Sequence, residues 1–132
     1  MSGFLDTSFV VRYLTADSPA LAERAARVLD GQGELVLTDV VLVETAYVLT
    51  SVYRIPREVV VDGLVALVQK ENLSVFGMEK GPVLQALLMC RSSGRVSFAD
   101  AMLWAAARSA GAEAVYSFDE RFPVDAVEIR RG

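Results

Sequence analysis

The chain of 132 residues contains no histidine and a single cysteine. Without histidine it cannot use a Ser-His-Asp or Cys-His catalytic arrangement, a pair of imidazoles, or histidine-ligated zinc. Cys90 alone cannot form an intrachain disulfide or a thiolate zinc cluster, and its apolar neighbours indicate an ordinary buried thiol. Any catalysis or metal binding must therefore use carboxylates, hydroxyls, arginine or lysine.

The chain also lacks a long apolar run and an excess of basic residues. No stretch approaches the roughly 18 uninterrupted apolar residues of a membrane-spanning helix, and the first residues lack the pattern of a secretory signal. We therefore expect a cytoplasmic protein that does not contact a membrane. The formal net charge of −4 argues against broad electrostatic capture of nucleic acid, although divalent cations bound among carboxylates would compensate it.

The periodicity predicts one domain spanning residues 1–132, because a hydrophobic content of 53% suffices for a continuous core at this length. Short β-branched runs alternate with longer helical patterns. The expected strands are Gly3 to Asp6, Leu35 to Thr38, Leu73 to Phe76, Ala114 to Ser117 and Ala126 to Arg130. The expected helices are Phe9 to Leu14, Pro19 to Asp30, Val40 to Tyr53, Arg57 to Lys70, Glu79 to Ser93 and Ser97 to Gly111.

This alternation predicts an α/β fold, a three-layer α/β/α sandwich with a central, mostly parallel sheet. Parallel strands need crossover connections, and helical crossovers cover both faces of the sheet. Ligands of such sheets bind beyond the carboxyl ends of the strands. Acidic residues at these ends are therefore the first candidates for a site.

Two aspartates lie at the carboxyl ends of expected strands. Asp6 ends the first strand, and Asp119 follows the strand that ends at Ser117. Each has a plainer interpretation: Asp6 is also placed to cap the next helix, and Asp119 beside Glu120 and Arg121 is also a typical turn residue.

Glu44 is the only charged side chain between positions 40 and 53. At helical spacing it shares a face with Val40 and Tyr47. An ionised carboxylate buried on that face needs a partner or becomes protonated, because burial of an unpaired charge is costly. The alternatives are a salt bridge to an arginine such as Arg12, or a partly exposed position.

Asp100 lies three residues after Ser97, the spacing of a capping box. The helix that follows is apolar all round, as expected of a central buried helix. Asp100 would then lie at the buried start of that helix, where it serves as a cap, a ligand or both.

We expect Asp6, Glu44, Asp100 and Asp119 to meet in one crevice, since all four lie at strand ends or helix starts. A like-charge pair about 4 Å apart costs on the order of 4 kcal/mol at an effective dielectric of 20. Such a cluster must bind protons or cations, and all-oxygen ligands favour Mg²⁺ or Mn²⁺.

Four segments resemble, in order and spacing, the PIN-domain family and its VapC-like toxin ribonucleases. They are Phe-Leu-Asp-Thr-Ser at 4–8, Val-Val-Leu-Val-Glu-Thr-Ala at 40–46, Ser-Phe-Ala-Asp-Ala-Met-Leu-Trp-Ala-Ala-Ala at 97–107 and Val-Tyr-Ser-Phe-Asp-Glu-Arg-Phe at 115–122. The chain departs from many relatives at Glu120, where another aspartate is common, and at Ser97, where some relatives carry an acid. These departures leave the four acids intact and bear on the number of metal ions and their affinity.

The resemblance implies a metal-dependent endoribonuclease, a hydrolase in which water activated by one or two Mg²⁺ or Mn²⁺ ions cleaves RNA and leaves 5′-phosphate ends. It implies that Asp6, Glu44, Asp100 and Asp119 are the catalytic, metal-binding residues. It further implies a homodimer, a small antitoxin partner and a role as the toxin of a toxin–antitoxin pair. The hydroxyls that it implies near metal or phosphate are those of Thr7, Ser8 and Ser117.

Arginines are candidates for contacts to the RNA backbone. Arg12, Arg95 and Arg121 are the main ones, with Arg91 and Arg108 further candidates. Two alternative functions remain: phosphotransfer through an aspartyl phosphate on Asp6, as in a receiver-type domain, and a catalytically silent PIN-like binding module.

Overall fold

Short strands and longer helices alternate along residues 2–132, the part of the chain that the computed structural model describes. The strands are β1 (Ser2–Phe4), β2 (Glu34–Leu37), β3 (Leu73–Val75), β4 (Ala114–Tyr116) and β5 (Glu128–Arg130). The helices are α1 (Thr7–Thr15), α2 (Pro19–Leu29), α3 (Asp39–Tyr47), α4 (Arg57–Val68), α5 (Lys80–Met89) and α6 (Phe98–Ala110), and the π-helix η1 (Val48–Val52) continues α3. Within these residues, every helix is too short or too polar to cross a membrane.

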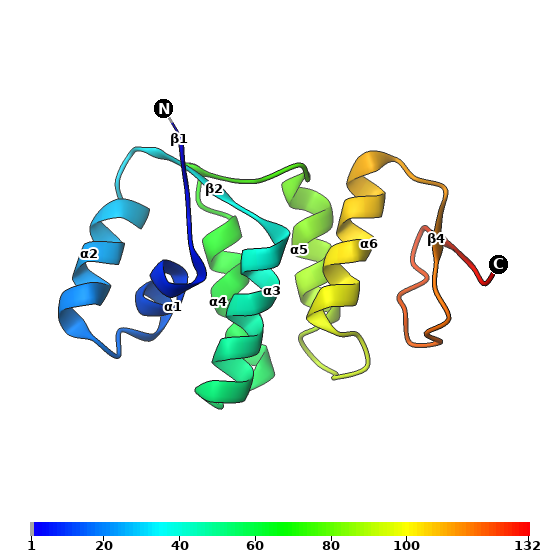
Figure 1. Ribbon diagram of the computed structural model, residues 1–132, viewed down its shortest axis with the longest axis horizontal. Coiled ribbons are helices and arrows are strands. Elements are labelled where there is room, and N and C mark those ends of the chain that lie inside the picture. The colour runs from blue at the N-terminus through cyan, green and yellow to red at the C-terminus, as the bar shows by residue number, and fades with distance from the viewer. Residues whose placement is uncertain (1) are drawn as a thin grey trace.

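The strands pair in parallel, as predicted, but they form two sheets. The first has the order β1-β2-β3, and the second contains β4 and β5. Figure 1 shows β4 at the opposite end of the molecule from α2, with α3 to α6 between β1 and β4. The predicted α/β class is confirmed, whereas the predicted single sheet is divided. Strand β1 is consequently an edge strand, and all three of its residues are exposed.

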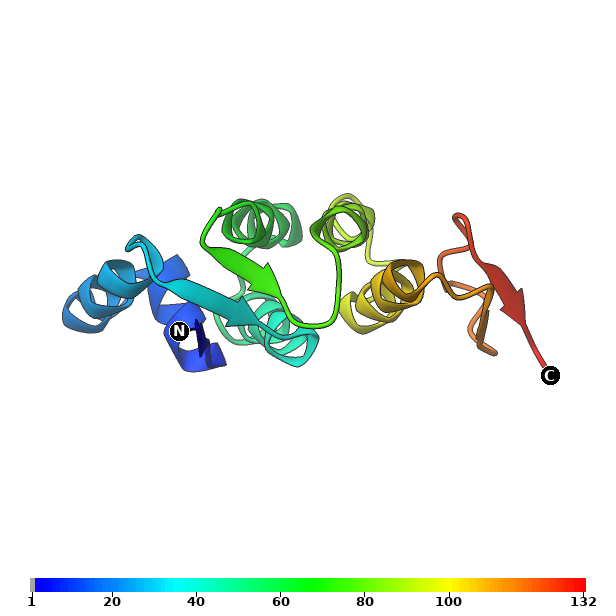
Figure 2. The same cartoon turned by 90° about the horizontal axis from the view of Figure 1, so that it is seen from above.

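Helices cover the first sheet from two sides. Seen from above (Figure 2), α4 and α5 lie on one side of the molecule and α3 and α6 on the other, with β2 and β3 running between α4 and α3. This layering agrees with the predicted sandwich. It follows from the parallel pairing, because each crossover must return the chain to the same end of the sheet.

Polar residues cap three of the helices, two of them at Asp6 and Ser97, where the sequence predicts caps. The side chains of Asp6, Thr38 and Ser97 accept hydrogen bonds from backbone amides in the first turns of α1, α3 and α6, respectively. Each bond satisfies an amide that has no partner within its helix. The caps fix where each helix starts, and therefore where the acids beside them lie.

Among the predicted boundaries that differ from the structure, two have clear local reasons. The helix expected to run to Tyr53 changes to a π-helix at Val48, where the Tyr53 amide donates to the Val48 carbonyl across five residues. The strand expected from Ala126 begins at Glu128, because Ala126 has a positive φ of 57° and leaves the extended region.

The core consists of aliphatic side chains from every helix layer. Burial of each Val or Leu side chain stabilises the folded state by about 1.5 to 3 kcal/mol relative to its exposure. Trp104 of α6 is 2% exposed, and its Nε1 donates to the Asp125 carbonyl at 2.8 Å. This bond ties α6 to the loop between β4 and β5. The largest fully buried side chains include Leu29, Leu37, Leu42, Leu64, Leu67, Leu73 and Leu87.

Substitution of Thr45 by valine is expected to stabilise the protein. Thr45 of α3 is fully buried, and its hydroxyl has no hydrogen-bond partner among the described residues. Because an unpaired buried polar group costs about 1 to 3 kcal/mol, Thr45→Val should raise the free energy of unfolding by about 1 kcal/mol, measured by urea denaturation.

The matched control makes the same exchange at the start of the same helix. Thr38 accepts from the Val41 amide at 3.2 Å, so Thr38→Val should lower the free energy of unfolding by about 1 kcal/mol. Equal destabilisation by both variants would contradict the assignment of an unpaired hydroxyl at Thr45.

Candidate functional site

Asp6 lies between the carboxyl end of β1 and the start of α1, as predicted. Its Oδ2 accepts from the Ser8 hydroxyl at 2.6 Å and from the Ser8 amide at 3.3 Å. These bonds, the hydroxyl first, stabilise the charged form and hold the pKa of the Asp6 carboxyl below its usual value. The interpretation as a helix cap is therefore correct, and the same carboxylate is exposed and ionised at neutral pH.

Glu44 is linked to Asp6 through the residue between Asp6 and Ser8. The Thr7 hydroxyl donates to Glu44 Oε1, and Thr7 itself is only 7% exposed. The bond joins the first turn of α1 to the middle of α3. The predicted Thr7 hydroxyl thus contacts the predicted acid directly, and it leaves Glu44 Oε2 available to another ligand.

The surroundings of Glu44 match the exposed alternative and not the buried one. Its face of α3 is open to solvent: Glu44 is exposed, and the apolar neighbours that share its face, Val40 and Tyr47, are 71% and 64% exposed. The proposed salt bridge to Arg12 is absent, because Arg12 pairs with Asp17 at 2.8 Å. Hydrophobic neighbours in sequence indicated burial, but on α3 the buried positions are Leu42, Thr45 and Ala46.

An apolar groove of about 560 Å³ lies between α3 and α6. Val40, Val43 and Tyr47 form one wall, and Met102 and Leu103 belong to the other. The carboxylate of Glu44 lies on its rim. The groove therefore places an acid beside an extended hydrophobic surface.

Asp100 occupies the first turn of α6, where the sequence predicts it. Its amide donates to the Ser97 hydroxyl at 3.0 Å, so the cap half of the predicted capping box is present. The Asp100 carboxylate is partly exposed, and α6 packs against α3.

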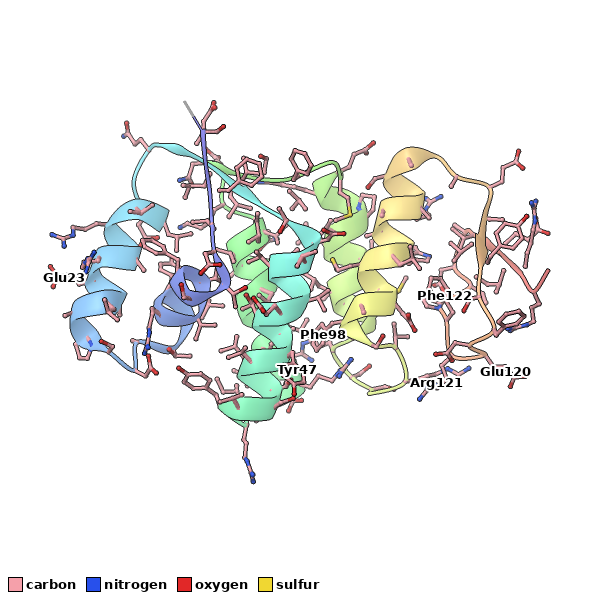
Figure 3. The ribbon with its side chains drawn as sticks, viewed as in Figure 1. Glu23, Tyr47, Phe98, Glu120, Arg121 and Phe122 are labelled. Carbon is pink, nitrogen blue, oxygen red and sulfur yellow. The ribbon has the colours of Figure 1, made fainter. Side chains whose placement is uncertain are left out.

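Asp119 lies in the loop that follows β4. Its Oδ1 accepts from the Arg121 amide at 2.8 Å and from Arg121 Nε at 3.3 Å. These bonds, the backbone one first, hold the pKa of Asp119 below its usual value. Figure 3 shows Arg121 and Glu120 near the β4–β5 sheet, well apart from Tyr47 at the lower end of α3. The interpretation of Asp119 as a turn residue is correct in this structure.

The sequence predicts that all four acids lie in one crevice, and the structure does not bring all four together. Within residues 2–132 no group of three or more acidic or cysteine side chains is close enough to hold a metal ion. The reason is the divided sheet: Asp119 follows β4, which does not pair with β1. Asp6 and Glu44 are linked through Thr7, Asp100 lies on α6, which packs against α3, and Asp119 lies in the loop after β4.

Counter-charges distinguish the acids. Asp119 has Arg121 beside it, whereas in the described part of the chain no lysine or arginine forms an ion pair with Asp6, Glu44 or Asp100. Oxygen donors of this kind suit a hard divalent cation. The oxygen donors of Asp6 and Glu44 therefore suit Mg²⁺ or Mn²⁺. Asp119, in contrast, is already paired with Arg121.

The remaining predicted side chains have intramolecular partners. The Ser117 hydroxyl accepts from the Asp119 amide at 3.0 Å and thus shapes the turn. Arg95 donates to the Glu120 carbonyl at 3.4 Å. Further candidate arginines are also engaged, Arg91 with Asp62 and Arg108 over the ring of Trp104.

Two residues near the site were missed from the sequence. Asp39 lies on the groove beside Glu44, and its carboxylate accepts from the Val40 amide at 2.8 Å. An acid in a first helical turn has an ordinary role with the helix dipole, so its position gave no distinct signal. Arg57 contacts the loop before α6, and nothing in the local pattern predicts that contact.

Comparison with known proteins gives one match. The family model described as PIN domain matches residues 3–126. No curated protein and no solved structure matches the chain. The matched range contains Asp6, Glu44, Asp100 and Asp119.

Removal of the Ser8 hydroxyl is expected to raise the pKa of Asp6. In Ser8→Ala the stronger of the two bonds to Asp6 is lost while the amide bond remains, so the pKa should move part of the way toward its ordinary value. Asp6 would then become protonated at a higher pH than in the wild type. A carboxyl-carbon NMR titration measures this directly, and Ser97→Ala, which removes a different cap, should leave the Asp6 titration unchanged.

Proposed function

The chain belongs to the PIN domain family, whose members are generally nucleases, and from this premise we propose that it is a divalent-cation-dependent endoribonuclease. The observation that carries the proposal is that Asp6 and Glu44 are linked through Thr7, while no basic side chain of the described residues forms an ion pair with either. Two uncompensated carboxylates favour binding of a cation over the free state.

The proposed ligands are Asp6, Glu44 and Asp100, with Asp119 as a further ligand for a second, weaker ion. The Ser8 bonds keep Asp6 ionised and fix its carboxylate at the start of α1. The Thr7 bond orients Glu44 in the same way. Participation of Asp119 requires its release from Arg121, which makes it the weakest member of the set.

One or two bound Mg²⁺ or Mn²⁺ ions would supply charge neutralisation at the scissile phosphate and a lowered pKa for the attacking water. The residues of the chain would hold the ions and orient them. Asp6 and Glu44 present their oxygens from two elements that the Thr7 bond locks together, so little reorganisation is needed. Arg12, Arg95 and Arg121 are the proposed contacts to the RNA backbone, after exchange of their present partners for phosphate.

The finer biological role is also a proposal. We assign the chain as the toxin of a toxin–antitoxin pair that acts in the cytoplasm, with a small antitoxin protein and a second copy of the chain as partners. The exposed apolar groove between α3 and α6 supports a protein partner, because contiguous exposed apolar surface is typical of an interaction site.

The test is cleavage of a structured RNA pool by the purified protein in Mg²⁺ or Mn²⁺. We expect cleavage to be abolished by a chelator and to yield 5′-phosphate ends. Asp6→Asn and Asp100→Asn should each reduce it by more than the roughly 10- to 100-fold that loss of a second-shell partner causes. Asp62→Asn, at an exposed ion pair with Arg91 on the far helix α4, serves as the matched control with full activity.

Two outcomes would contradict the proposal. Stable labelling of Asp6 by acetyl phosphate, without RNA cleavage, would favour phosphotransfer. Binding of a partner by a protein that neither cleaves RNA nor binds Mn²⁺ would favour a silent binding module.

A further inference from the structure

Arg57 begins α4, and its guanidinium group binds the loop that connects α5 to α6. Its Nε donates to the Cys90 carbonyl, and its Nη2 donates to the Val96 carbonyl. Cys90 directly follows α5 and Val96 precedes the cap of α6. A single side chain thus joins the two ends of this loop.

The same guanidinium group also packs against the first residue of α6. The Arg57 Cζ lies 4.4 Å from the centroid of the Phe98 ring, at the lower end of α6 in Figure 3. Stacking on an aromatic face and donation from a planar fork are properties that arginine has and lysine lacks. In the described part of the chain Arg57 forms no ion pair, so its charge serves these loop contacts.

The loop contacts lead directly to Asp100. Val96 is followed by Ser97, whose hydroxyl accepts from the Asp100 amide, and Phe98 lies two residues before Asp100. The Cys90 thiol adds a weak bond to the Ser97 carbonyl at 3.8 Å. Residues 96–98 set the first turn of α6. Each of them is therefore held either by Arg57 or by the Cys90 thiol.

We infer that Arg57 is a positioning residue for Asp100: its guanidinium group, bound to the Cys90 and Val96 carbonyls and stacked on Phe98, fixes the orientation of the first turn of α6 for cation binding. The inference rests on the proposed function, because Asp100 is a proposed ligand there. It concerns a side chain that does not itself touch the cation or the RNA.

The test measures Mn²⁺ affinity by electron paramagnetic resonance in Arg57→Gln and Arg57→Lys. Because partners that orient metal ligands typically contribute 10- to 100-fold to affinity, we expect a loss on the order of 10-fold in Arg57→Gln. Arg57→Lys should not restore the affinity, because it keeps the charge but loses the fork and the stacking. The matched control is Arg91→Gln, which removes the same charge from an exposed ion pair near the loop and should bind Mn²⁺ normally.

Two further readouts separate positioning from folding and from the proposed function. Trypsin should cleave after Arg95, in the loop, faster in both Arg57 variants than in wild type or Arg91→Gln. The emission of Trp104, the only tryptophan, should stay that of a buried side chain, because the body of α6 remains packed.

Each result decides one question. Unchanged Mn²⁺ affinity and loop cleavage in Arg57→Gln would overturn the inference, and so would exposure of Trp104, which would assign Arg57 to global folding. Wild-type protein that binds no Mn²⁺ would refute the proposed metal site, and the loop cleavage would then report on Arg57 independently. Restoration of both properties by Arg57→Lys would show that charge, and not geometry, is responsible.

Discussion

The hydrogen bond from Thr7 to Glu44 is the contact on which the site depends, because it connects two elements that are distant in sequence. Thr7 belongs to α1, whose cap is Asp6, and Glu44 belongs to α3, whose far side contributes to the core. Since Thr7 is buried, water competes little for its hydroxyl. Two acids that carry like charge are thus linked through a neutral donor, and no basic side chain of the described residues pairs with either.

The other two acids are held by different interactions, so the four acids differ in how readily they would bind a cation. Asp100 depends on the loop between α5 and α6, which Arg57 and the Cys90 thiol secure. Asp119 depends on a turn in which Arg121 already supplies positive charge. A cation that recruits Asp119 must compete with that guanidinium group, whereas one at Asp6 and Glu44 meets no competitor from a basic side chain in the described residues. Affinity should therefore arise first at the α1–α3 contact.

Local features of the site were predictable from the sequence, and long-range ones were not. The caps at Asp6 and Ser97 and the strand before Asp119 follow from patterns within a few residues, so their positions agree with the structure. The separation of β4 from β1 depends on which strands pair, which no local pattern encodes. The sequence could not decide between burial and exposure of Glu44 for the same reason: its apolar neighbours indicate burial only if another element covers that face of α3. Thus the local positions of these acids on strand ends and helix starts could be predicted, and their distances from one another could not.

Under the proposed function, the exposed groove beside Glu44 would couple partner binding to cation binding through electrostatics. In the open groove, water solvates the Glu44 carboxylate. Any ligand that covers the apolar walls at Val40, Tyr47 and Leu103 removes that water and lowers the local dielectric constant. The ionised carboxylate then becomes costly unless a proton or a cation accompanies the ligand. A cation at Asp6 and Glu44 therefore favours covering of the groove, and by thermodynamic reciprocity a covering ligand that leaves the cation in place strengthens its binding.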